Sequence, residues 1–291
     1  HELRKAANDL GIHVIGDIPI FVSTNSADVW SHPEIFKLDD SFQPRVVAGV
    51  PPDLFSDTGQ LWGNPHYDWE YLRKTDYHWW QQRIQHTLKQ VDVLRIDHFR
   101  GFEAAWEIPA DAETAEHGHW VKGPAHHFFR VIREKMGRLP IVAEDLGRID
   151  EKVLDIRDTF DFPGMKILQF AFDSDEKNSY LPQNYDGDHY IVYTGTHDNN
   201  TTRGWYEALS EERRKQVLKF TPSKEKSICW RMIEAALKSR ARWAVFPMQD
   251  ILCLDGSHRM NLPGTSENNW SWRLDSLNLP EDRLEKYRRM T

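Results

Sequence analysis

Short apolar runs alternate with longer amphipathic segments along most of this chain. Six runs of about five to eight residues have the length and composition of buried strands, and they lie near residues 12–19, 91–96, 140–147, 165–172, 190–196 and 243–252. Segments with a helical period are expected at residues 2–10, 77–90, 124–136, 150–160, 210–219, 224–240 and 279–290. This alternation predicts an α/β protein with a parallel sheet and helical crossovers.

The pattern favours part of a (β/α)₈ barrel over an open doubly wound sheet. No glycine-rich phosphate loop of the G-x-G-x-x-G type follows any of the six runs, and such a loop is typical of the open sheet. A barrel needs eight strands, so the two missing strands would precede His1. We expect one catalytic barrel over residues 1–291, with an insertion at residues 21–75 where no strong period appears.

Acidic residues end four of the six predicted strands: Asp17, Asp97, Glu144 and Asp198. Strand ends of parallel α/β folds are where sites are built. Four carboxylates at one end of a barrel repel one another, so such a cluster is unfavourable unless function requires it. Two explanations stay open, which are a Mg²⁺ or Ca²⁺ site and glycoside chemistry by a carboxylate–carboxylic acid pair.

The neighbours of these acids predict different protonation states. Strand side chains alternate, so Arg95 and Asp97 share one face, and a nearby cation favours the ionised form that a nucleophile needs. Glu144 follows an apolar run, which raises a carboxyl pKa and suits a general acid. A purely structural Arg95–Asp97 ion pair is the alternative, and Asp145, on the face opposite Glu144, is expected to be structural.

Composition narrows the classes of partner. A net charge of −8 disfavours nucleic acid and anionic membranes, which select basic patches. The chain contains 12 tryptophans, and flat aromatic rings stack on sugars as well as filling cores. Its two cysteines form no disulfide framework or metal quartet. We expect a cytoplasmic protein that uses neither cofactor nor metal.

Several motifs resemble one carbohydrate-active family. Residues 95–101, 143–147 and 195–199 resemble the region signatures of the α-amylase-like clan. They resemble more closely the 4-α-glucanotransferase family, also called amylomaltase or disproportionating enzyme. Four further segments resemble that family: residues 16–22, 47–53, 62–65 and 259–265.

The resemblance implies roles for individual residues. It implies a retaining transferase of α-1,4-glucans in which Asp97 is the nucleophile, Glu144 the acid/base and Asp198 the transition-state stabiliser. It implies substrate contacts by seven further residues: Arg95, His197, Asp17, Asp53, Gln60, Trp62 and Asn261. It also makes the six strands the third to the eighth of the barrel.

Three functions follow as hypotheses. The first is transfer between maltooligosaccharides or α-1,4-glucans through a glucosyl-Asp97 intermediate, with acceptor-side residues 48–62 excluding water. The second is hydrolysis of α-glucans by the same residues. The third is a non-catalytic glucan-binding segment, because six strands do not close an eight-stranded barrel; on this reading residues 1–291 alone are inactive or insoluble. No nucleic-acid or membrane partner is expected, and the sequence does not predict an oligomeric state.

Overall fold

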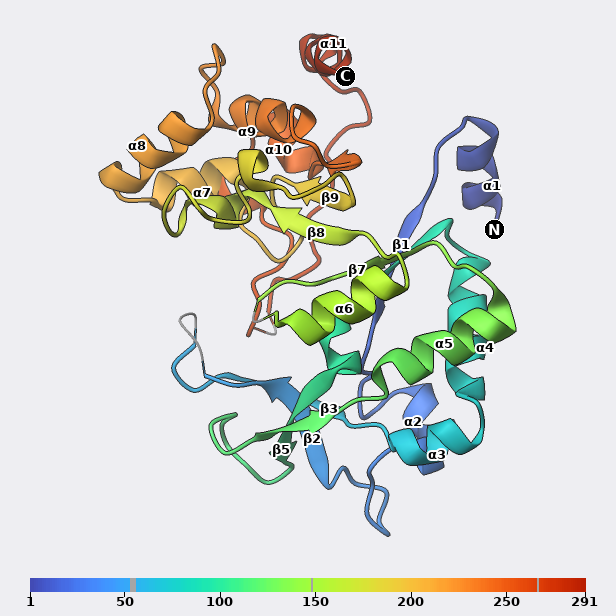
Figure 1. Cartoon of the computed structure of the whole chain (residues 1–291). Coiled ribbons are helices and arrows are strands. Elements are labelled where there is room, and N and C mark those ends of the chain that lie inside the picture. Colours follow the sequence, from blue (N-terminus) through green and yellow to red (C-terminus); the bar gives the residue numbers. More distant parts are fainter. Residues whose placement is uncertain (53–55, 148, 266) are drawn as a thin grey trace. The chain divides into compact units, whose positions relative to one another are not determined.

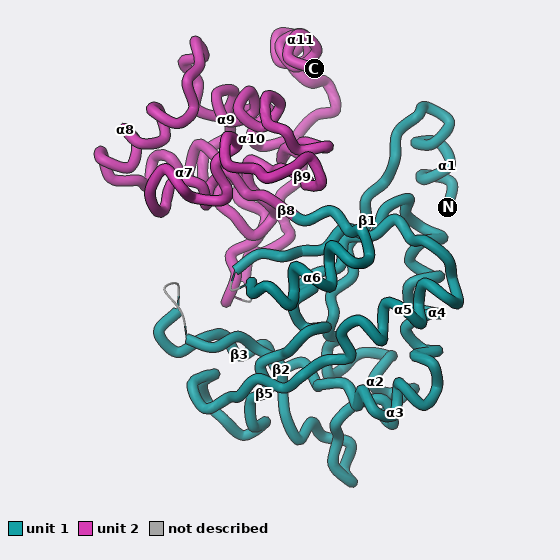
Figure 2. The backbone as a smooth tube through the Cα atoms, in the orientation of Figure 1, with its two compact units in different colours: residues 1–164 teal, residues 165–291 magenta. Residues whose placement is uncertain are grey.

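The structure is a computed structural model of the 291-residue chain, and it describes residues 1–52, 56–147, 149–265 and 267–291. The chain divides into two compact units, residues His1–Gly164 and Met165–Thr291 (Figure 2). Each unit mixes helices with strands, as the alternating pattern predicts. Within the described residues, no helix is both long and apolar enough to cross a membrane.

The first unit is built around a parallel three-stranded sheet in the order β1-β4-β7. Figure 1 labels β1 and β7 of this sheet. These strands are β1 (Ile15–Pro19), β4 (Val93–Asp97) and β7 (Ile141–Ala143). The α-helices of this unit are α1 (Glu2–Asp9), α2 (Ala27–Ser31), α3 (Trp69–Lys74), α4 (His78–Leu88), α5 (Ala125–Met136) and α6 (Glu151–Thr159).

Alternation along β4 separates its core from its polar face. Leu94 and Ile96 are fully buried in the main apolar cluster, whereas Arg95 and Asp97 lie on the other face and form an ion pair. In the register of the sheet, Asp17 of β1 pairs with Arg95. The sheet therefore brings together three charges that come from two strands.

A second sheet in this unit corrects the prediction that residues 21–75 lack regular structure. It is antiparallel, in the order β3-β2-β5-β6. Its strands are β2 (Val46–Val50), β3 (Gln60–Pro65), β5 (Ala104–Pro109) and β6 (His119–Lys122). The segment after β4, expected to be a loop, thus pairs with the segment between β1 and α3.

The second unit contains a three-stranded sheet in the order β8-β9-β10, in which β9 and β10 are parallel. The strands are β8 (Gly164–Ile167), β9 (Tyr190–Tyr193) and β10 (Trp243–Val245). Its helices are α7 (Thr202–Ala208), α8 (Glu211–Phe220), α9 (Ile228–Leu237), α10 (Met248–Leu252) and α11 (Glu281–Met290).

The five short 3₁₀ segments of the described chain are Pro33–Ile35, Phe99–Phe102, Leu168–Phe172, Pro182–Asn184 and Gly256–His258.

Each of the six predicted strands has a counterpart, but several boundaries were wrong. The run at 165–172 changes to a 3₁₀ segment after Ile167, and the run at 243–252 contains helix α10. Helix α7 was not predicted. The side chain of Asp150 caps α6. Helix α4 begins at His78, one residue later than predicted, because Tyr77 has a left-handed backbone with φ +57°.

Candidate active site

One buried cation organises the carboxylates at the end of β4. Arg95 donates from Nη1 to Oδ2 of Asp17 at 2.5 Å and from Nη2 to Oδ1 of Asp97 at 2.9 Å. The Arg95 side chain is 10% exposed, but those of Asp97 and Asp17 are 41% and 43% exposed. A pair serving only the core would bury both partners, whereas here both carboxyl groups stay exposed beside a buried guanidinium.

Glu144 follows β7 and lies in a contrasting environment. Its two carboxyl oxygens accept hydrogen bonds from the backbone N–H groups of His98 at 2.7 Å and Leu146 at 3.0 Å. Burial, and then the negative charge of Asp97, raise the pKa of Glu144 from 4.5 to about 7. Arg95 and the two backbone bonds oppose that rise. The carboxyl therefore holds its proton at a pH where an ordinary glutamate has lost it.

His98 connects Glu144 to the neighbouring antiparallel sheet and was not singled out from the sequence. Its backbone is left-handed, with φ +53°, and this conformation directs its N–H at Glu144. Its ring meets Trp62 edge-to-face, with centroids 4.8 Å apart. Burial lowers the pKa of His98 to about 4, and Nε2 has no hydrogen-bond partner within the described chain. The ring is neutral and acts through packing; only its place beside Asp97 could have drawn attention to it.

Two predicted acceptor-side residues lie on β3. Trp62 donates from Nε1 to the side-chain oxygen of Gln60 at 3.1 Å, and 38% of Trp62 stays exposed. The neighbouring carbonyl of Gly63 accepts a hydrogen bond from Thr24. The indole is thus held in place while part of its surface remains open. Asp53, the third residue predicted for this side, lies outside the described residues.

In the second unit, Asp198 is held by its neighbour His197 and by residues far away in sequence. Asn261 donates from Nδ2 to Oδ1 of Asp198 at 2.6 Å, and Nε2 of His197 lies 3.3 Å from Oδ2. The His197 ring packs on Trp270 with centroids 5.0 Å apart. Arg259, which the sequence analysis did not single out, donates to the backbone carbonyl of Asp198 at 2.6 Å.

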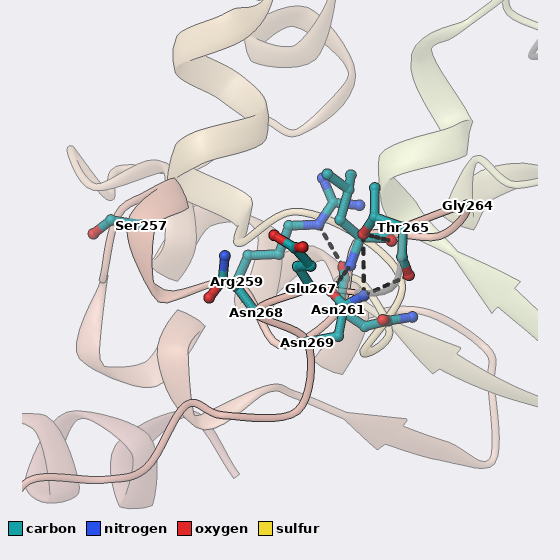
Figure 3. Close-up of a pocket in the computed structure, with 9 residues that line it drawn as sticks. Ser257, Arg259, Asn261, Gly264, Thr265, Glu267, Asn268 and Asn269 are labelled. Carbon is teal, nitrogen blue, oxygen red and sulfur yellow. Dashed lines mark hydrogen bonds between the residues drawn. The ribbon is translucent and has the colours of Figure 1, made fainter.

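Beside this cluster is a hollow of about 600 Å³. Figure 3 shows the residues that line it, most of which have polar side chains: Ser257, Arg259, Asn261, Leu262, Gly264, Thr265, Glu267, Asn268 and Asn269. Asn261 and Arg259 belong both to this lining and to the hydrogen bonds around Asp198. These two residues therefore connect the cluster around Asp198 to the hollow.

The structure thus groups the predicted residues into two sets. Arg95, Asp17, Asp97, Glu144, Gln60 and Trp62 belong to the first unit, and His197, Asp198 and Asn261 to the second. That the two sets meet at one sugar ring stays a prediction. Asp145 forms a buried ion pair with Arg157 at 2.6 Å, as expected for a structural residue. The described residues hold no group of three or more His, Cys, Asp or Glu placed to bind a metal ion.

Fold and site together define an α/β protein that holds two carboxyl groups in opposite environments at the ends of parallel strands. Comparison with known proteins narrows this class. The family model described as 4-alpha-glucanotransferase matches residues 1–278. The chain therefore belongs to the 4-alpha-glucanotransferase family.

Individual relatives agree with this assignment. The chain is 48% identical over 279 residues to a 4-alpha-glucanotransferase of Thermus thermophilus, covering 94% of this chain and 56% of that protein. It is 50% identical over 282 residues to the Synechocystis 4-alpha-glucanotransferase, covering 95% of this chain and 56% of that protein. The chain thus spans little more than half the length of these curated relatives.

Two solved structures of amylomaltases are similar to this chain. Amylomaltase from Streptococcus agalactiae in complex with acarbose superposes with a TM-score of 0.96 at 43% identity, covering all of this chain and 59% of that one. Amylomaltase from Corynebacterium glutamicum shares the fold, with a TM-score of 0.74 at 18% identity, over 92% of this chain and 43% of that one.

Proposed function

We propose that the protein is a retaining 4-α-glucanotransferase that moves α-1,4-glucan segments between maltooligosaccharides. The observation that carries the proposal is the contrast between two neighbouring acids. Asp97 is paired with a buried arginine, whereas Glu144 has a pKa of about 7. Retaining glycoside chemistry needs this contrast, because one carboxylate attacks while the other carboxylic acid donates a proton.

In the first half-reaction, the Asp97 carboxylate attacks the anomeric carbon of the donor glucan. The glycosidic C–O bond breaks, and the leaving oxygen takes the proton of Glu144. The donor segment is then bound to Asp97 as a β-glycosyl ester, and the shortened glucan departs with a free 4-hydroxyl. We infer that the two carboxyl groups lie about 5 Å apart across the scissile bond, the spacing of retaining enzymes.

In the second half-reaction, Glu144 is ionised and acts as a base. It takes the proton of the 4-hydroxyl of an acceptor glucan, whose oxygen attacks the anomeric carbon and releases the Asp97 carboxylate. Transfer exceeds hydrolysis only if the acceptor outcompetes water. We assign acceptor binding to Trp62, Gln60 and Asp53; the indole surface of Trp62 suits stacking on a sugar ring.

The remaining predicted residues stabilise the sugar as positive charge develops on it. We propose that Asp198 and His197 contact its hydroxyl groups, that Asn261 contributes a further hydrogen bond, and that Arg95 holds the carboxyl groups of Asp97 and Asp17 in place. The hydrogen bonds that fix Asp198 and Asp97 support this proposal, since a preorganised carboxylate needs no reorganisation at the moment of reaction.

The proposal extends to the architecture and setting of the protein. We propose that the six strands β1, β4, β7, β8, β9 and β10 are the third to eighth strands of a (β/α)₈ barrel. Residues 21–75 then form a subdomain on the acceptor side. We further propose a cytoplasmic enzyme whose partners are maltooligosaccharides and α-1,4-glucans, and which binds acarbose as the S. agalactiae relative does.

Incubation of the purified full-length protein with maltotriose tests the activity. Transfer gives glucose and longer maltooligosaccharides while the number of reducing ends stays constant. Hydrolysis raises that number with every cleavage, and a non-catalytic glucan-binding protein leaves maltotriose unchanged. Constant reducing ends with a ladder of longer products is the predicted result; either of the others overturns the proposal.

Replacing Trp62 by alanine tests the acceptor assignment. Loss of the stacking surface weakens acceptor binding by about 1–3 kcal/mol, the range found for aromatic stacking on bases, so a larger share of the glycosyl-enzyme goes to water. We predict a higher ratio of hydrolysis to transfer, measured as reducing ends formed per glucose released. Trp243 to alanine is the control, because that exposed tryptophan lies on β10; an unchanged ratio in the Trp62 variant contradicts the assignment.

A further inference from the structure

The loop that carries Asp198 joins β9 to α7 and is fixed at both ends by one buried carboxylate. Asp250 accepts hydrogen bonds from the hydroxyl of Thr194 at 2.6 Å and from the hydroxyl and backbone N–H of Thr202 at 2.7 and 2.8 Å. All three residues are buried. These bonds set where the loop leaves the strand and enters the helix, but they do not touch Asp198.

Arg259 is the side chain that fixes Asp198 itself. Its Nη2 donates to the backbone carbonyl of Asp198 at 2.6 Å, and its Nε donates to the backbone carbonyl of Asn261, also at 2.6 Å. The Asn261 amide donates in turn to Oδ1 of Asp198 at 2.6 Å. One guanidinium thus holds both the backbone of Asp198 and the residue that orients its carboxylate. Arg259 and Asn261 are labelled in Figure 3.

The segment after Asn261 is stabilised by hydrogen bonds of its own, and the ring of Trp270 within it also contacts His197. The side-chain oxygen of Asn269 accepts from the N–H of Leu262 at 2.9 Å, and its amide donates to the carbonyl of Thr265 at 2.9 Å. This closed turn keeps its own shape. Arg259 and Asn261 supply the hydrogen bonds that join it to Asp198, and Trp270 adds a ring contact with His197.

We propose that Arg259 is a positioning residue for glucan transfer, which sets the orientation of the Asp198 carboxylate by holding Asp198 and Asn261 in one fixed arrangement. The inference rests on the proposed function of Asp198. Arginine suits this role because its planar fork presents two N–H donors in fixed directions. The single ammonium of lysine keeps the charge but does not reproduce two such directed bonds.

The first experiment compares Arg259→Lys with the unchanged full-length protein on maltotriose. A carboxylate displaced by about 1 Å costs on the order of 100-fold in rate, so we expect kcat to fall about 10- to 100-fold. KM should change less than about threefold, because an interaction made chiefly in the transition state is lost. In Arg259→Ala, added guanidinium should restore part of the lost kcat, which a general loss of packing would not allow.

Arg231→Lys is the matched control. Arg231 is also half-buried in the second unit and also donates to backbone carbonyls, those of Thr221 at 2.7 Å, Ser223 at 3.2 Å and Glu225 at 3.1 Å. It touches neither Asp198 nor Asn261 through these bonds. We expect the control to lose thermal stability and to keep kcat.

The outcomes separate this inference from the proposed function. If the unchanged protein transfers glucan and Arg259→Lys keeps kcat within about twofold, the positioning role is overturned and the function stands. If the unchanged protein does not transfer, both are overturned. A crystal structure of Arg259→Lys adds a readout without turnover: we expect the Asp198–Asn261 hydrogen bond to break, and an intact bond contradicts the inference even if activity falls.

Discussion

At the scale of single residues, the protein places two neighbouring carboxyl groups in contrasting surroundings. Arg95 lies against Asp97 and supplies a permanent positive charge. Glu144 receives two backbone hydrogen bonds that favour its ionised form, yet burial and the charge of Asp97 outweigh them and raise its pKa to about 7. The balance leaves Glu144 able both to give and to take a proton near neutral pH.

The nucleophile assignment predicts that Asp97→Asn abolishes transfer and leaves the fold intact. The amide keeps the size of the side chain but is not a nucleophile, so the rate should fall by a factor on the order of 10⁴ or more, as for other residues of a catalytic set. Glucose release from maltotriose measures the loss, and circular dichroism checks the fold. Substantial residual turnover by a folded variant rules out the assignment.

The raised pKa of Glu144 predicts how activity depends on pH. Cleavage of maltotriose needs the protonated form, so kcat/KM should decline as pH rises through about 7. An α-maltosyl fluoride donor provides the control, because fluoride departs without a proton and the decline should be absent from its kcat/KM. The same decline with both donors would show that another group is titrating.

The same shift predicts a dependence of stability on pH. Because the folded-state pKa of Glu144 lies above its unfolded value, its contribution to stability is fully present below pH 4.5 and is lost as pH rises towards 7. The loss amounts to at most about 3 kcal/mol in the free energy of unfolding. Urea unfolding between pH 4.5 and 8 should show a steeper decline for the parent than for Glu144→Gln. Parallel curves would contradict the shift.

At the scale of elements, strand register and strand ends place the chemistry. The pairing of Asp17 with Arg95 across β1 and β4 brings a carboxylate from 78 residues away onto the same cation. The turn after β4 carries His98, which links Glu144 of one sheet to Trp62 of the other. A small displacement of either sheet therefore changes the positions of Asp97 and Glu144.

Sequence patterns predicted what depends on neighbours along the chain. The shared face of Arg95 and Asp97 follows from a period of two, and the raised pKa of Glu144 follows from the apolar run before it. The patterns missed β2, β3, β5 and β6, because their pairing joins residues 46–65 to residues 104–122 and their burial does not alternate. The contact of Asn261 with Asp198 spans 63 positions, and spacing alone carries no signal for such a contact.

The antiparallel sheet gives a test at this scale. A Cβ added at Gly49 of β2 would lie 2.1 Å from the backbone oxygen of Gln60 on β3. We predict that Gly49→Ala destabilises the protein by about 1–3 kcal/mol and lowers transfer more than hydrolysis, since β3 carries Trp62. Gly187→Ala is the control because its nearest neighbouring atom is 4.0 Å away. Equal stability of the two variants, measured by urea unfolding, would contradict the prediction.

At the scale of the whole molecule, the proposed catalytic residues are divided between two compact units. Asp97 and Glu144 belong to residues 1–164 and Asp198 to residues 165–291. The proposed reaction requires all three to act on one sugar. Substrate binding should therefore protect amides of both units from hydrogen exchange, including those near residues 95–98 and 196–199, and protection confined to one unit would contradict a shared site.

The central claim is that Asp97 forms a covalent bond to the sugar, while Glu144 first donates a proton and then accepts one. The most direct measurement uses Glu144→Gln with α-maltosyl fluoride, because formation of the ester needs no acid whereas its breakdown needs a base. Mass spectrometry of peptides from the quenched protein should find one maltosyl group on the peptide that contains Asp97. No adduct, or an adduct on a peptide that lacks Asp97, would contradict the account.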